Sequence, residues 1–173
     1  MLGVIVLSTL AGAVQAGAGG SVKAVEADDL VKLTAFVGWP ATVLGPPDTP
    51  FNLCILGPDP FGPLLDHAAE GAVASGRPVV VRRVATLAAS AGCRVAFVAA
   101  SPDQPVTAVL QALRGQPVLT VTDQGAPGAQ GVVDFVVNQD QVRFDIDDQS
   151  AADRGLSISS KLLSLALTVR PRK

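Results

Sequence analysis

Tyrosine is missing from this 173-residue sequence, which contains one tryptophan, six phenylalanines and one histidine. Basic residues are not in excess either, since 13 Lys and Arg face 15 Asp and Glu and the formal net charge is −2. A chain of this charge offers no electrostatic basis for binding DNA or RNA. The one basic cluster, Arg170-Pro171-Arg172-Lys173, ends the sequence and is expected to be a solvated tail.

Signatures of phosphate binding are incomplete. The stretch 55–62, ILGPDPFG, places Gly57 and Gly62 at the spacing of a P-loop, but the required Lys and Ser/Thr do not follow. A phosphate cradle consists of backbone N–H groups, which the prolines at positions 58, 60 and 63 lack. Asp59 adds a negative charge, so we expect a structural turn in which Asp59 caps a helix starting at Pro60.

Catalytic and metal-binding patterns are missing as well. His67 is expected on a helix surface without an orienting partner for base catalysis. A Ser-x-x-Lys nucleophile would need serine at position 158, where Ile158 stands, and Ser157 is expected to cap a helix instead. No His, Cys or carboxylate cluster has the spacing of metal ligands. The sequence therefore predicts a protein that is not an enzyme and holds no metal or cofactor.

The N-terminus predicts export. Residues 2–14 are apolar and are followed by small residues, as in a signal peptide, so we assign residues 1–18 to the signal and 19–173 to one domain. No Lys or Arg precedes the apolar run, which leaves an uncleaved anchor or an upstream start as alternatives. After cleavage the protein would be exported, without direct membrane insertion.

The sequence has two cysteines, Cys54 and Cys93. In an oxidising compartment they are expected to form one disulfide, and the alternative is a pair of buried thiols. The pairing constrains the fold. The bridge can form if strand one lies between strands two and three (order 2-1-3), whereas in the order 3-2-1 the two Cα atoms would be about 10 Å apart. We predict 2-1-3.

Apolar strands alternate with helical segments up to residue 123. This pattern predicts an α/β fold with a mostly parallel sheet and helices on both faces. A C-terminal antiparallel hairpin (132–137 and 141–146) should follow, with its second strand at a half-exposed sheet edge, and then a terminal helix (157–169). The expected strands are 51–57, 79–84, 94–100 and 118–123, and the expected helices are 22–37, 60–74, 85–91 and 103–114.

An ordered set of segments resembles the YfiR family of small exported bacterial proteins over about residues 22–169. The most specific are the helix ending in Trp-Pro, the Gly-x-Asp-Pro-Phe-Gly turn and the Ile-Ser-Ser-Lys-Leu-Leu segment near the C-terminus. The segments are VKLTAFVGWP (31–40), FNLCILGPDPFG (51–62), GRPVVVRRV (76–84), GCRVAFVAAS (92–101), LRGQPVLTVTD (113–123), VVDFVVNQDQVRFDID (132–147) and GLSISSKLLSLA (155–166).

The resemblance implies a dimeric, redox-sensitive periplasmic regulator. Its partner would be the periplasmic sensor domain of a membrane-bound diguanylate cyclase. By binding this domain the regulator would repress the cyclase, so that cyclic-di-GMP synthesis and biofilm formation stay low. A histidine kinase or another sensor is an alternative partner. Cys54 and Cys93 match one cysteine pair of the family, and the second pair is absent here.

Two kinds of binding site follow from these readings. Phe36, Val37 and Trp39 would anchor a protein partner if they are exposed, and the alternative is that they pack in the core. The rival function, a periplasmic small-ligand sensor, would place its site at the carboxyl ends of the parallel strands. Its candidate residues are Gly57, Asp59, Ser101 and Asp123.

Overall fold

A computed structural model describes residues 18–124, 129–139 and 141–173. The predicted signal peptide therefore lies outside the described residues, except for its last position. The described chain begins with helix α1 (Ala18–Leu33), which starts four residues before the predicted helix 22–37. Among the described helices, none combines the length and apolar character that crossing a membrane requires.

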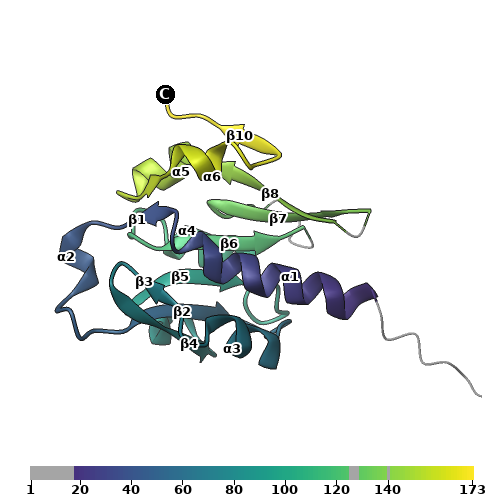
Figure 1. The fold of residues 1–173 in the computed structure, drawn as a ribbon, viewed down its shortest axis with the longest axis horizontal. Coiled ribbons are helices and arrows are strands. Elements are labelled where there is room, and N and C mark those ends of the chain that lie inside the picture. Colours follow the sequence, from purple (N-terminus) through teal and green to yellow (C-terminus); the bar gives the residue numbers. More distant parts are fainter. Residues whose placement is uncertain (1–17, 125–128, 140) are drawn as a thin grey trace, which may run out of the picture.

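An eight-stranded sheet forms the centre of the molecule (Figure 1), which confirms the predicted α/β class with a mostly parallel sheet. Its strand order is β10-β8-β7-β6-β5-β2-β4-β3. Neighbours from β4 to β7 run parallel, as do β8 and β10, whereas β3–β4 and β7–β8 are antiparallel. The strands are β2 (Phe51–Leu56), β3 (Val73–Ala74), β4 (Arg77–Val84), β5 (Cys93–Val98), β6 (Leu119–Asp123), β7 (Val133–Asn138), β8 (Gln141–Asp147) and β10 (Thr168–Arg170).

Hydrophobic clusters cover both faces of the sheet. Alternate residues of β2 point to opposite faces, so Leu53 and Ile55 join the larger cluster under α1 and α3, while Cys54 and Leu56 join a smaller one under α4. Strand β2 lies between β4 and β5, with parallel pairing on both sides. The remaining elements are α2 (Ala41–Leu44), α3 (Pro63–Ala69), a 3-10 helix (Leu87–Ser90), α4 (Val106–Ala112), α5 (Asp148–Asp153), α6 (Ser160–Leu163) and the small sheet β1 (Val37–Gly38) with β9 (Ser157–Ile158).

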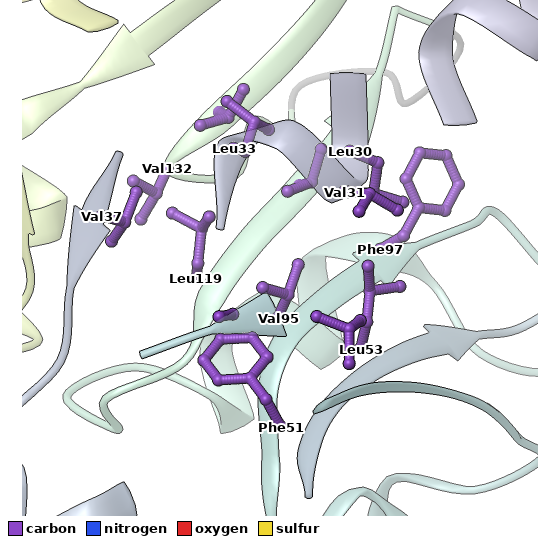
Figure 2. Packing of buried hydrophobic residues seen from close by; sticks show 14 of the residues in the cluster. Leu30, Val31, Leu33, Val37, Phe51, Leu53, Val95, Phe97, Leu119 and Val132 are labelled. Atoms are coloured by element: carbon purple, nitrogen blue, oxygen red, sulfur yellow. The ribbon is translucent and has the colours of Figure 1, made fainter. Parts of the chain in front are cut away.

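The larger cluster is built around aromatic and branched side chains (Figure 2). Leu30 and Val31 of α1 face Phe97 across the sheet surface. The ring of Phe97 also meets that of Phe61 edge-on, with centroids 4.8 Å apart. Such edge-to-face pairs add to the burial energy of the cluster. Because Leu30 and Val31 are buried in this cluster, packing on the sheet as well as helix propensity stabilises α1.

The buried face of helix α1 is not purely apolar. Leu30 and Leu33 are buried, but Val25 is 44% exposed. Leu30 lies five residues beyond Val25, which is about 140° around a helix, whereas Glu26 lies four residues before Leu30 and shares its face. The buried stripe therefore contains a carboxylate, that of Glu26.

The predicted helix 60–74 is wrong at both ends. Helix α3 starts at Pro63 rather than Pro60, and its N-cap is Gly62 rather than Asp59. The chain turns after α3 at Gly71, whose φ is 68°, and β3 and β4 form a hairpin across Ser75-Gly76, with φ of 49° and 73°. Two residues of positive φ are what a tight two-residue hairpin needs, and Ser75-Gly76 was the available signal.

The predicted terminal helix 157–169 is also wrong. Only Ser160–Leu163 is helical, with the Ser159 hydroxyl accepting from the backbone of Leu162. Thr168–Arg170 instead form β10, which pairs in parallel with β8. Strand β8 is therefore internal and not the edge strand that was expected from its alternating pattern. The β-branched residues Thr168 and Val169 favour a strand, which lets this segment pair with the otherwise free edge of β8.

Candidate functional site

Cys54 and Cys93 form the predicted disulfide. They lie on the neighbouring strands β2 and β5, and their Cα atoms are 5.8 Å apart. Both side chains are buried, with 0% and 1% exposure, in the cluster under α4. A bridge buried in this way is shielded from thiols in solution and joins two central strands.

The segment after α1 is mostly buried. Val37 and Trp39 are 6% and 8% exposed and belong to the larger core cluster, so the condition of exposure is not met for them. The Trp39 ring meets Phe51 edge-on, and its Nε1 donates to the Arg94 carbonyl at 3.2 Å. Phe36 is half-buried, and the Lys161 ammonium lies 5.6 Å from its ring centroid.

The four candidate ligand residues at the strand ends make contacts within the protein. Asp59 accepts from the backbone of Phe61 and pairs with the Arg83 guanidinium, both at 2.7 Å. Ser101 forms an isolated antiparallel β-bridge with Gln104, and the Asp123 carboxylate forms an ion pair with the Lys23 ammonium of α1. None of the four lines the cavity between α4 and α5 or either of two smaller or more open cavities in the described part of the chain.

Gly57 is required by a close backbone approach. Its φ is 96°, and a Cβ built there would lie 2.8 Å from the Ala99 carbonyl oxygen. We expect Gly57→Ala to lower the free energy of unfolding by about 2 kcal/mol in urea denaturation. Gly62→Ala is the matched control, because Gly62 also has a positive φ (52°) but has nothing within 4 Å of that position. Equal losses in the two variants would contradict the close-approach argument.

Sequence reasoning missed a charged cluster beside the same strand ends. Lys23 of α1 donates to Glu26 at 2.5 Å and to Asp123 at 2.7 Å, and its ammonium lies 5.8 Å from the Phe61 ring centroid. The Glu26 side chain is fully buried, and its Oε1 has no hydrogen-bond partner among the described residues. Burial raises the pKa of Glu26 against the opposing effect of Lys23. The i to i+3 spacing of Lys23 and Glu26 was visible, but their burial was not.

A polar cavity of about 460 Å³ lies between the ends of α4 and α5, which sequence reasoning also missed. Two arginines border it: Arg114 follows α4 and is exposed, whereas Arg154 follows α5 and is half-buried. Arg154 also donates to the Leu113 carbonyl. The two arginines are far apart along the chain and border the same cavity only in the folded protein.

No group of three or more His, Cys, Asp or Glu residues suited to a metal ion occurs among the residues that the structure describes.

The chain matches the YfiR/HmsC-like family over residues 23–167. No curated protein matches it. The family match spans well over half of the sequence and includes the disulfide and the sheet from β2 to β8. The chain therefore belongs to the YfiR/HmsC-like family.

Proposed function

We propose that this protein is an exported, non-catalytic regulator. It binds the periplasmic sensor domain of an inner-membrane signalling protein of the diguanylate cyclase type and represses it, which limits cyclic-di-GMP output. The observation that supports this proposal is the family match, which extends from within α1 to the residue before β10. Repression requires that the regulator binds the inactive state of the receptor more tightly than the active one.

Phe36 is the candidate partner contact that is open to solvent. Its ring is half-buried and lies next to the Lys161 ammonium, so an aromatic and a cationic group are offered together. The backbone around Phe36 is tied down, because its carbonyl accepts from Ser159 and the following strand β1 pairs with β9. We propose that Phe36 touches the partner, while the buried Val37 and Trp39 fix the segment that presents it.

The partner is sought first with the C-terminally tagged protein as bait in an inner-membrane extract under non-reducing conditions. Mass spectrometry should recover a membrane protein that joins a periplasmic sensor domain to a cyclase or kinase domain. A bait that returns alone would contradict the regulator function.

Phe36→Ala should then weaken binding to the purified sensor domain by about 30-fold, the loss typical of a truncated aromatic anchor. Titration calorimetry measures the change. Leu64→Ala is the matched control, since Leu64 is an apolar residue on α3 with 37% exposure. Unchanged affinity for Phe36→Ala, or an equal loss in the control, would exclude Phe36 as the anchor.

We also propose that the protein is a homodimer in the periplasm, which sedimentation velocity of the mature chain tests directly. A single monomeric species at micromolar concentration would contradict the dimer.

The second candidate function, a small-ligand sensor, is favoured by one observation, the cavity between α4 and α5. That cavity is not at the carboxyl ends of the strands, where the ligand site was expected.

A further inference from the structure

The cavity between α4 and α5 lies at the opposite end of the parallel strands. Residues 113–118 lead from α4 into the start of β6, and the backbone N–H of Asp147, at the end of β8, donates to Val132 just before β7. The cavity thus opens beside the amino-terminal ends of β6 and β7. Its volume of about 460 Å³ falls within the range of small-molecule sites.

The lining is mainly polar. Hydroxyl and amide side chains come from α4, from the segment before β7 and from α5, and they surround the two guanidinium groups. The polar lining residues other than the arginines are Thr107, Gln111, Gln130, Ser150 and Asp153.

Neither of the two arginines has a carboxylate within ion-pair distance among the described residues. The lining carboxylate, Asp153, instead accepts from the Gln149 amide at 2.8 Å. Burial lowers the pKa of Arg154 and repulsion from Arg114 lowers it further, while attraction from Asp147 and Asp153 opposes these two effects. An anion between the two groups would remove this repulsion and supply acceptors for both.

We propose that this cavity binds a small polar oxyanion, a phosphate ester or carboxylate, held between the guanidinium groups of Arg114 and Arg154. Guanidinium forks match the oxygens of both anion types. The hydroxyl and amide groups of the lining then contact the polar body of the ligand. This inference is independent of the regulator function, since the binding is measured on the purified protein without a partner.

The test is calorimetric titration of the purified protein at low ionic strength. Three probes separate the possible anions: inorganic phosphate, glycerol 3-phosphate and malate. We expect saturable binding of one molecule per chain for at least one of them. Binding of the two phosphates alone assigns a phosphate site, and binding of malate alone assigns a carboxylate site. No saturable binding of any probe up to about 10 mM would overturn the proposal.

Three variants locate the site. Arg114→Gln should weaken binding by about tenfold or more, the loss expected for one charge-assisted contact. It should fold normally, because Arg114 is exposed. Arg143→Gln is the matched control, an exposed arginine on β8 outside the cavity, and should bind as the parent does. Arg154→Lys keeps the charge but loses the fork and should also bind more weakly. Equal weakening by Arg114→Gln and Arg143→Gln would show only a general charge effect and would overturn the assignment.

Discussion

Replacing both cysteines by alanine should lower the free energy of unfolding by about 4 kcal/mol. The bridge closes a loop with a sequence separation of 39 residues, and without it the unfolded chain gains the corresponding entropy. Alanine is chosen because both positions are buried among apolar side chains, where a serine hydroxyl would add a cost of its own. Urea unfolding of the oxidised parent and of Cys54→Ala/Cys93→Ala measures the difference.

The same bridge should resist reductant while the protein is folded. Because both side chains have at most 1% exposure, a thiolate reaches the sulfurs only after β2 and β5 separate. The rate of reduction by dithiothreitol should therefore rise with urea in step with the opening of the sheet. Rapid reduction in the absence of urea, at the rate of an exposed model disulfide, would show that the bridge is an accessible switch rather than a structural link.

Features determined by local sequence could be predicted well. The apolar runs around Cys54 and Cys93 lead to buried parallel strands, and their pairing as a disulfide agrees with the neighbour relation of β2 and β5. Errors arose where two local readings competed. Val73 continues an apolar helical pattern, but the positive φ at Gly71 and Ser75-Gly76 ends the helix and forms a hairpin.

Features determined by tertiary contacts could not be predicted. Val169 ends the helix predicted for 157–169, yet it pairs with the edge of β8 as part of a strand. Likewise, nothing near Arg114 in the sequence shows that Arg154 will share its cavity. The cavity of the proposed anion site therefore lies away from the candidate ligand residues for a physical reason. The residues at the carboxyl ends of the strands are occupied by ion pairs and turns, and the open polar space lies at the other end.

The buried charge of α1 gives the second large effect. Lys23→Met should lower the free energy of unfolding by about 3–4 kcal/mol at pH 7, because the fully buried Glu26 would lose its paired cation. Lys32→Met is the matched control. Lys32 is on the same helix and pairs with Asp28 at 2.7 Å, but both side chains are more than half exposed, so its loss should cost less than about 0.5 kcal/mol.

The pH dependence of the Lys23→Met effect has a definite sign. Burial raises the pKa of Glu26 above its ordinary value of 4.5, and Asp123, the other acid facing it, acts in the same direction. A carboxyl with a raised pKa in the folded state favours folding at low pH, and this contribution is lost as the pH rises through the folded value. The cost of Lys23→Met should accordingly shrink as the pH falls from 7, because Glu26, whose pKa is raised, takes up its proton before the pH reaches the ordinary value of 4.5.

A double variant completes the test. Lys23→Met/Glu26→Gln should recover most of the stability that Lys23→Met loses at pH 7, since no buried carboxylate then remains without its cation. Urea denaturation at a series of pH values measures the free energy of unfolding of the parent, Lys23→Met, Glu26→Gln and the double variant. If the double variant were as unstable as Lys23→Met, or if the loss did not change with pH, the effect would come from lost packing against Phe61 and not from the charge of Glu26.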